Sequence, residues 1–444
     1  MGEEPGNARM RQSAIGRTAR LASLPMGYAG RTTIGLGKRL VGRPASAVLT
    51  EVQLRTADQI FKVLGELKGG AMKFGQAMSI FESALPDELV GPYRDALTKL
   101  QDSAPPMSAR MLTSVLAEDL GHEWRTRFTE FDTTPVASAS IGQVHRATWA
   151  DGTEVAVKVQ YPGAARALRS DLRQLGRMAR LFTVLAPGLD IKPLLAEVEA
   201  RVAEELDYSL EAAAQSIFAD EFADDPDFVV PAVVAHTPRV LVTTWMESTS
   251  SLAQVIKAGT PEERDRVGGL YARFLVCGPT RTGLMHADPH PGNFRVLDDG
   301  RLGVVDFGAV ARLPEGFPRP LGELLSRGVR DDWDAVVDGL RDEGFLLPRT
   351  VFSPDDLADY LGPFLDAGRA ESFQFSRAWL RSQTVRVATP TQENLSRAFK
   401  LNLPPDYMLI HRVWLGGFGV LCQLEATVEF RALLEQYVPG FEPV

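Results

Sequence analysis

The sequence is poor in cysteine and in long apolar runs, and its basic residues are outnumbered by acidic ones. Only two cysteines occur among 444 residues, Cys277 and Cys422, which excludes a disulfide framework and indicates a reducing compartment. The longest apolar stretch, residues 407–424, is interrupted by His411 and Arg412, so a buried helix is favoured over a membrane span. The basic N-terminus is not followed by the apolar segment that a secretory signal peptide requires.

Acidic residues outnumber basic ones over the whole chain, but basic residues are in excess at the N-terminus. The formal net charge is -9 and the pI is about 5.4, which argues against nucleic acid as a partner. Residues 1–48 nevertheless form a basic head, which is either a solvated tail or a contact for an anionic membrane surface. We therefore expect a cytoplasmic protein and leave peripheral membrane binding open.

The pattern of apolar residues changes several times along the chain. It predicts helices over residues 51–102 and 164–223, and strands within 137–160 and 238–246. The dipeptide Asp151-Gly152 between two β-rich runs is a strong hairpin signal. These patterns predict that the chain is divided into four segments: a basic flexible head (1–48), a helical extension (49–130), a β-sheet lobe with a helical insertion (131–247) and a helical lobe (248–444).

The first β-rich run carries a candidate phosphate-binding loop. Its small residues fall at the positions of G-x-G-x-x-G-x-V, the loop that covers ATP phosphates in protein kinases. Two of the glycines are alanines here, and their Cβ atoms restrict the backbone. A strand that happens to carry small residues is the alternative interpretation. The candidate nucleotide contacts are Ala137, Ser138, Ala139, Ser140, Gly142 and Val144.

Lys158 lies near the end of the apolar strand that follows this loop, in VAVKV. A lysine on a buried strand needs an anionic partner, and in protein kinases the lysine at this place pairs with the α- and β-phosphates of ATP. The alternative is a lysine that extends to solvent from an edge strand. The order of loop and lysine favours nucleotide binding.

The stretch HADPHPGNFRV, residues 286–296, resembles a catalytic loop. Asp288 and Asn293 have the spacing of the kinase H-R-D-x-x-x-x-N motif, in which the Asp orients or deprotonates the acceptor and the Asn holds Mg²⁺. Asp306, in VVDFGA further on, is placed to ligate Mg²⁺. These motifs predict phosphotransfer with ATP and Mg²⁺ as cofactors.

Zinc is an alternative for the same stretch because His286 and His290 lie close together. Further Cys or His ligands at a metal-binding spacing are missing nearby, which makes a zinc site a poor explanation. We expect both rings to bond the loop backbone and to fix the shape of the loop.

The chain resembles the UbiB/ADCK/AarF (ABC1-type) atypical kinases between about residues 50 and 425. The resemblance implies an α+β, bilobal protein-kinase-like fold with a mixed β-sheet N-lobe, a helical C-lobe and an N-terminal helical extension over the active site. The motifs that carry it are MKFGQ (72–76), LQDSAPPM (100–107), ASASIGQVHRA (137–147), ELDYSLEA (205–212) and HADPHPGN (286–293).

The resemblance also implies roles for individual residues. Lys73 of the K-x-G-Q motif would reach into the site and meet Glu205 and Asp207, while Glu211 would pair with Lys158. On an ideal helix Asp207 and Glu211 share a face, whereas Glu205 points elsewhere. A solvated acidic face is the alternative interpretation for these carboxylates.

The activity implied by the resemblance is that of an ATP-dependent phosphotransferase or ATPase. It would support isoprenoid quinone or other lipid metabolism, because a helix over the cleft would hinder general protein phosphorylation. Ser138 departs from the family's Ala-rich loop, and the hydrophobic C-terminal anchor of some bacterial relatives is missing. Two other functions stay open: a non-catalytic nucleotide-sensing module that chaperones a lipid or a biosynthetic complex, and a small-molecule phosphotransferase of the aminoglycoside kinase type.

Overall fold

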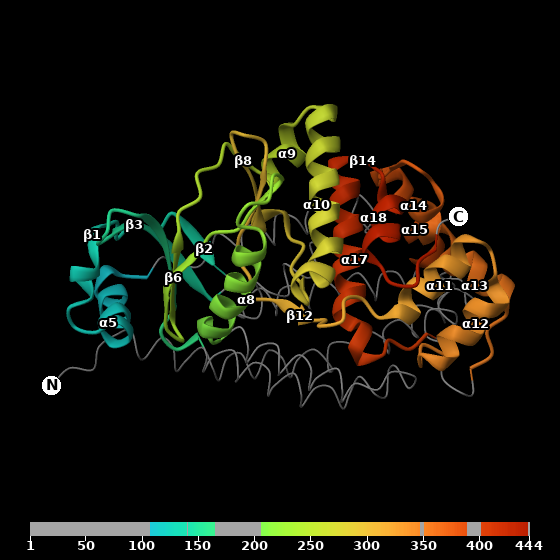
Figure 1. The fold of residues 1–444 in the computed structure, drawn as a ribbon, viewed down its shortest axis with the longest axis horizontal. Helices are drawn as coiled ribbons and strands as arrows, with labels where there is room; N and C mark the ends of the chain where they lie inside the picture. The colour runs from blue at the N-terminus through green and yellow to red at the C-terminus, as the bar shows by residue number, and fades with distance from the viewer. Residues whose placement is uncertain (1–106, 140, 165–205, 347–349, 389–400, 443–444) are drawn as a thin grey trace, which may run out of the picture. The chain divides into compact units, whose positions relative to one another are not determined.

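The structure is a computed structural model, and it describes residues 107–139, 141–164, 206–346, 350–388 and 401–442 (Figure 1). These residues belong to one compact unit. The basic head, the predicted helix over 51–102, and the candidate residues Lys73, Ser140 and Glu205 lie outside the described residues. Within the described chain, an antiparallel sheet with flanking helices precedes a mostly helical part, as the α+β kinase-like expectation requires.

The N-terminal part is built on a six-stranded sheet with the order β1-β3-β4-β7-β6, to which β2 adds by pairing with β3. Neighbouring strands in it run antiparallel. The parallel pairing of the unit lies elsewhere, between β5 and β11. The strands are β1 (Phe128–Phe131), β2 (Ala137–Ala139), β3 (Gly142–Trp149), β4 (Glu154–Gln160), β6 (Val233–His236) and β7 (Val240–Thr244).

Strand alternation decides which side of this sheet Lys158 faces. Val155, Val157 and Val159 of β4 are fully buried and pack in one hydrophobic cluster with helix α5 (Ala109–Leu120). Because successive side chains on a strand point to opposite faces, Lys158 projects from the other face of the sheet. Helix α8 (Tyr208–Glu221) packs against β6 and β7 there.

A buried polar chain joins the start of α5 to the sheet. The amide oxygen of Gln143 accepts from the backbone N–H of Met107 at 2.8 Å, and its amide nitrogen donates to His145 Nε2 at 2.8 Å. His145 Nδ1 therefore carries the ring proton and donates to the carbonyl of Asp132 at 2.8 Å. Burial lowers the pKa of His145 below its ordinary value of 6.5.

This chain predicts a loss of stability in mild acid. As the pH falls through about 6.5, the unfolded chain takes up a proton on His145 before the folded protein does, so the free energy of unfolding decreases. One such group contributes a slope of at most about 1.4 kcal/mol per pH unit. Urea unfolding between pH 7.5 and 5 should show a smaller slope for His145→Gln than for the wild type. Equal slopes would contradict the assignment.

The C-terminal part is mostly helical, with short strands between the helices. Its four-stranded sheet has the order β5-β11-β10-β8, and two further pairs are β9 with β12 and β13 with β14. The strands are β5 (Phe228–Val229), β8 (Ser250–Ser251), β9 (Leu284–His286), β10 (Phe294–Val296), β11 (Leu302–Val304), β12 (Val310–Arg312), β13 (Phe373–Gln374) and β14 (Thr427–Val428).

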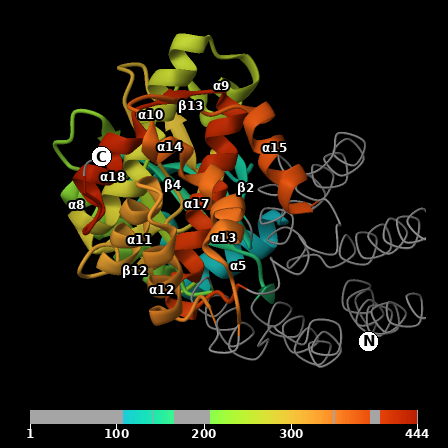
Figure 2. The ribbon, with the colours of Figure 1, turned by 90° about the vertical axis from the view of Figure 1, so that its right-hand side faces the viewer.

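Helices α10 and α17 lie side by side, and α9, α15 and α18 pack against them (Figures 1 and 2). Helix α12 packs against α11 and α13, and α12 and α13 contribute to a separate hydrophobic cluster. Thr260 caps α10 by accepting from Glu263 N, and Gly283 ends it with φ +68°. The helices are α9 (Leu252–Ala258), α10 (Pro261–Thr282), α11 (Arg319–Val329), α12 (Trp333–Asp342), α13 (Pro354–Leu361), α14 (Asp366–Arg369), α15 (Arg377–Ala388), α17 (Pro405–Leu424) and α18 (Phe430–Tyr437), with 3₁₀ turns η1 (Trp124–Arg127), η2 (Pro291–Asn293) and η3 (Gly362–Leu365).

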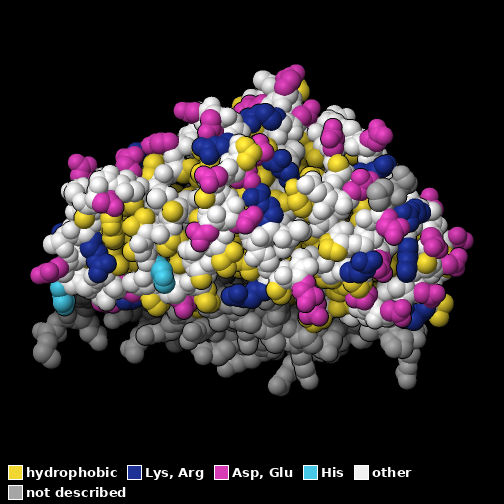
Figure 3. Space-filling view, in the orientation of Figure 1, with side chains coloured by type: hydrophobic (Ala, Val, Ile, Leu, Met, Phe, Trp, Pro, Cys, Tyr) yellow, Lys and Arg dark blue, Asp and Glu magenta, His cyan; other side chains and the backbone are white. Residues whose placement is uncertain are grey.

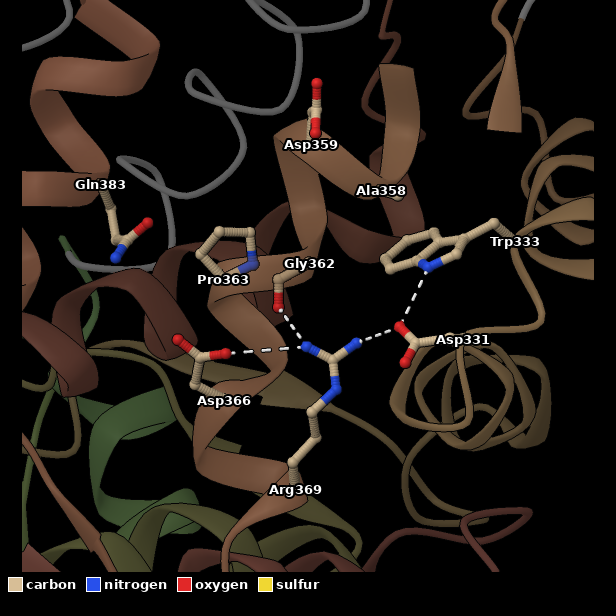
Figure 4. A pocket seen from close by; sticks show the side chains of 9 residues that line it. All are labelled: Asp331, Trp333, Ala358, Asp359, Gly362, Pro363, Asp366, Arg369 and Gln383. Atoms are coloured by element: carbon tan, nitrogen blue, oxygen red, sulfur yellow. Dashed lines mark hydrogen bonds and ion pairs between the residues drawn. The ribbon is translucent and has the colours of Figure 1, made fainter. Parts of the chain in front are cut away.

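Arg369 joins the helices at the far end of this part (Figure 4). Its guanidinium donates to Asp331 at 2.6 Å and to the carbonyl of Gly362 at 3.1 Å, and it lies 3.6 Å from Asp366. Trp333 donates its indole N–H to the same Asp331 at 3.1 Å. The cavity of about 340 Å³ that these side chains line contains none of the candidate nucleotide or metal residues that the structure describes. We interpret Arg369 as a structural link.

The main sequence-based predictions for the described elements are confirmed. The Asp151-Gly152 turn joins β3 and β4, the run over 238–246 contains β7, and residues 407–424 lie in the largely buried α17. In the described chain, no helix is both long enough and apolar enough to cross a bilayer. On the face shown in Figure 3, Lys and Arg side chains are scattered among Asp and Glu side chains.

Several short elements were not expected from the sequence. The strand pairs β9 with β12 and β13 with β14 have two or three residues each, too few to show a periodicity. Helix α5 and strand β1, which ends at Phe131, share one hydrophobic core with the other strands of the six-stranded sheet. The division of the chain at residue 131 stays a prediction.

Candidate active site

Lys158 and Glu211 form a buried ion pair between strand β4 and helix α8. Lys158 Nζ lies 2.7 Å from one carboxylate oxygen of Glu211 and 2.9 Å from the other. The two side chains are 13% and 5% exposed. Nζ also lies 3.3 Å from Asp306 Oδ1 and 5.1 Å from the centre of the Tyr208 ring. The strand lysine therefore meets an acid from α8 and an acid from the C-terminal part.

The two carboxylates fix the charge of Lys158. Burial acts to lower the pKa of Lys158, but the nearby charges of Asp306 and Glu211 outweigh that effect and raise the pKa above its usual value. The ammonium is therefore a permanent cation at physiological pH. A permanent cation on this strand is what a polyphosphate would need as a partner.

Asp207 begins helix α8 and does not belong to its body. Its backbone is extended, with φ -124° and ψ 99°, and its side chain accepts from Ser209 N at 2.9 Å. Ideal-helix geometry does not place Asp207 and Glu211 on one face, because Asp207 lies at the N-cap, before the first helical residue. Asp207 thus orients the start of the helix that carries Glu211.

The predicted phosphate-binding loop is a tight hairpin between β2 and β3. Ala137 pairs with Val144, and Ala139 pairs with Gly142. Ala137 and Ser138 are exposed and Ala139 is half-buried. Contact of this segment with a nucleotide stays a prediction.

Gly142 has a different structural role from the one expected of a phosphate-loop glycine. A Cβ atom added to Gly142 would lie 2.3 Å from the carbonyl oxygen of Val159 on β4 and 3.0 Å from the Tyr208 hydroxyl. Glycine is therefore needed here for the close approach of two strands. Nucleotide contact by its backbone stays a prediction.

Asp288 and Asn293 lie in the loop between β9 and β10 and are bonded to each other. The amide nitrogen of Asn293 donates to Asp288 Oδ2 at 3.0 Å and to the Asp288 carbonyl at 3.2 Å. The amide oxygen of Asn293 is thereby left as the atom that can meet a cation. On the other side of Asp288, Arg412 of α17 lies 3.8 Å from Oδ1.

Asp306 follows β11 and is brought next to Asn293 by strand pairing. In the β10–β11 register Phe294 faces Val304, and Val305 N donates to the Asn293 carbonyl at 2.9 Å. Asp306 has φ +67°, which is rare for a residue with a side chain. Its Oδ1 accepts from Gly308 N at 3.2 Å, which holds the turn.

The two histidines of the loop bond backbone, as the sequence predicted. His286 Nε2 donates to the Asp306 carbonyl at 2.9 Å, and His290 Nδ1 accepts from Gly292 N at 3.1 Å. Burial lowers the pKa of both rings. Tyr271 of α10 donates its hydroxyl to the carbonyl of Pro289 at 2.7 Å, a further fixed point that the sequence did not reveal.

The residues present fit a magnesium nucleotide. The described chain contains no group of three or more His, Cys, Asp or Glu side chains that could hold a metal alone. A carboxylate from Asp306 and an amide oxygen from Asn293 form the kind of sparse oxygen set that Mg²⁺ uses together with water and phosphate oxygens. Lys158 beside Asp306 supplies the cation for the phosphates.

Arg412 and Tyr208 were missed as residues of this site. The sequence showed Arg412 only as a polar break in an apolar helix, and such a break is a usable signal. Tyr208 is 2% exposed and lies beneath the Lys158 ammonium, but its place after Asp207 carries no signal of its own.

The family match and similar relatives all point to atypical kinases. The family described as the ABC1 atypical kinase-like domain matches residues 99–340. "Atypical kinase COQ8, mitochondrial" of Saccharomyces cerevisiae is 34% identical over 85% of this chain and 75% of its own length. "Protein ACTIVITY OF BC1 COMPLEX KINASE 1, chloroplastic" of Arabidopsis thaliana is 30% identical over 90% of this chain, which spans only 57% of that relative's length.

Solved structures that match this chain include one that shares both sequence and fold with it. It is that of Rv3197 from Mycobacterium tuberculosis in complex with erythromycin, with 44% identity and a TM-score of 0.69. The match covers 90% of this chain and 100% of the Rv3197 chain. Taken with the family match and the kinase-like arrangement of Lys158, Glu211 and Asp306, these similarities show that the chain belongs to the ABC1 atypical kinase-like family.

Proposed function

We propose that this chain binds Mg-ATP between its sheet and its helical part and acts as an ATP-dependent phosphotransferase or ATPase. The observation that supports it best is the meeting of Lys158 with Glu211 at 2.7 Å and with Asp306 at 3.3 Å. These three groups come from a strand, a helix and a loop of distant sequence. A partly buried cluster of one lysine and two acids is typical of a kinase nucleotide site.

Each residue of the site has a role in this proposal. Lys158 holds the α- and β-phosphates, and Glu211 fixes the direction of the lysine. Asn293 and Asp306 hold the metal, which when bound neutralises charge on the phosphates. Asp288 orients the oxygen that attacks the γ-phosphate, and its bond from Asn293 at 3.0 Å fixes the carboxylate for that task.

The finer proposal is that this activity supports isoprenoid quinone or other lipid metabolism. It is supported by membership of the family and by the basic composition of residues 1–48, which suits contact with an anionic membrane surface. A nucleotide-binding chain that touches a membrane can act on a lipid-linked acceptor without entering the bilayer.

Asp306→Asn is expected to abolish magnesium-dependent ATP turnover. The substitution removes the carboxylate charge that faces the metal while it keeps the shape of the side chain, so turnover should fall by about 100-fold or more. Phosphate release at saturating ATP measures the effect. Asp299→Asn, an exposed acid in the turn between β10 and β11, is the matched control and should keep wild-type turnover. Retained magnesium-dependent turnover in Asp306→Asn would overturn the metal assignment.

One experiment distinguishes the nucleotide-sensing hypothesis from the enzyme hypothesis. Phosphate release and nucleotide-induced thermal stabilisation are measured on the same wild-type protein, with and without vesicles of anionic phospholipid. An enzyme shows turnover in at least one of these conditions. Stabilisation by nucleotide with no turnover in any of them would replace the enzyme by a sensor.

A further inference from the structure

Arg412 interrupts an otherwise apolar helix and points toward the catalytic loop. Its neighbours Ile410 and Val413 on α17 are 3% and 1% exposed, whereas the Arg412 side chain is 38% exposed. One terminal nitrogen lies 3.8 Å from Asp288 Oδ1. The Nε atom is buried and has no hydrogen-bond partner among the described residues. The Arg412 guanidinium therefore lies beside Asp288 and still has an N–H group that is available to donate a hydrogen bond.

The distance between Arg412 and Asp288 shows that the two side chains do not form a hydrogen bond. A separation of 3.8 Å is an ion-pair distance and is too long for a hydrogen bond. Asp288 is instead positioned from its other side, where Oδ2 accepts from Asn293 at 3.0 Å. Removal of Arg412 would therefore leave the loop's own hydrogen bonds in place.

Among the residues that the structure describes, the other basic groups near the loop already have partners. His290 Nδ1 accepts from Gly292 N, so that nitrogen carries no proton, and His286 Nε2 donates to the Asp306 carbonyl. Lys158 is bonded to Glu211 and lies against Asp306. Arg412 lies beside Asp288 and still has N–H groups that can donate to negative charge formed during the reaction.

We propose that Arg412 binds the phosphoryl group while it is transferred, an inference that rests on the proposed function. The acceptor oxygen, of water or of a hydroxyl, forms a bond to the γ-phosphorus while the bond from that phosphorus to the β,γ-bridging oxygen breaks. The bridging oxygen keeps the electron pair as ADP leaves, and the proton of the acceptor passes to Asp288. Arg412 donates to the equatorial oxygens, where an arginine supplied by the same chain stabilises the transition state.

The test compares binding of the ground state with binding of a transition-state mimic. Titration calorimetry with Mg-ADP, alone and with aluminium fluoride, is carried out on wild type and on Arg412→Gln. We expect an unchanged affinity for Mg-ADP, and an affinity for the aluminium fluoride complex that falls by roughly 100-fold. The kcat of phosphate release should fall by a similar factor, while the KM for ATP changes by less than about threefold.

Two further variants keep the test decisive. Arg412→Lys retains the charge but loses the planar fork, so its kcat should lie between those of wild type and Arg412→Gln. If the glutamine variant does not fold, the lysine variant carries the same comparison. Arg319→Gln is the control, because Arg319 is 73% exposed on α11.

The outcomes separate this proposal from the one it rests on. Equal losses of affinity for Mg-ADP and for the aluminium fluoride complex, or no loss of either, would overturn the role of Arg412 alone. A wild-type protein that binds no magnesium nucleotide would overturn the proposed function and this role with it. If the wild type binds nucleotide but shows no turnover, the affinities for Mg-ADP and for the aluminium fluoride complex still decide the role of Arg412.

Discussion

Replacing Lys158 with methionine should abolish nucleotide binding and lower the free energy of unfolding by about 3–5 kcal/mol. Glu211 is 5% exposed and would lose the ammonium that lies 2.7 Å from it. Loss of one member of a buried ion pair costs more than the pair contributes, because the charge that remains is still desolvated. Urea unfolding and calorimetry with Mg-ATP measure the two effects. Lys257→Met, an exposed lysine on α9, is the control.

A double variant separates stability from function. Lys158→Met combined with Glu211→Leu replaces both charges by apolar groups, which often restores the stability lost in the single variant. It should still bind no nucleotide. Nucleotide affinity retained by Lys158→Met would disprove the role of the lysine, and a double variant as unstable as the single one would disprove the electrostatic explanation.

Gly142→Ala is the second substitution expected to have a large effect. The added methyl group would lie 2.3 Å from the Val159 carbonyl oxygen, a backbone atom that cannot move without shifting β4. We expect a loss of about 3 kcal/mol, at the upper end of the range for overpacking. Because Val144 pairs with Lys158 in the same ladder, nucleotide affinity should fall as well. Urea unfolding and calorimetry measure both.

Gly269→Ala is the matched control for that substitution. Gly269 lies in α10, and a Cβ added there meets nothing within 4 Å. Alanine should leave the stability unchanged or raise it by up to about 1 kcal/mol. If Gly142→Ala proved as stable as Gly269→Ala, the close approach of β3 and β4 would not be what requires glycine at this position.

The sequence was informative wherever a signal is local. Asp151-Gly152 predicted the β3–β4 turn, in which Gly152 has φ +91°, because few other residues adopt that conformation. The spacing from Asp288 to Asn293 predicted two residues that the structure bonds together, since five residues of loop bring these side chains into reach of each other. The Lys158–Glu211 contact was available only from the family resemblance.

Contacts that depend on the packing of distant segments could not be predicted from the sequence. Arg412 reaches Asp288 only because α17 packs against α10 next to the loop. The helical wheel failed at Asp207 because the helix begins one residue later, and helix ends are poorly fixed by periodicity. Roles for Lys73 and Glu205 stay predictions.

Helix α8 bridges the two halves of the fold (Figure 1). Its first turn carries Glu211, while Phe218 further along is fully buried. The Phe218 ring lies 4.9 Å, centre to centre, from the ring of Phe307, the residue after Asp306, and is tilted by 40° to it. A swing of this helix away from the sheet would also displace the aromatic ring that packs beside Asp306, the proposed metal ligand. An outward movement of this helix would therefore break the Lys158–Glu211 ion pair and disturb the Phe218–Phe307 contact in the same step, so both halves of the site would be lost together.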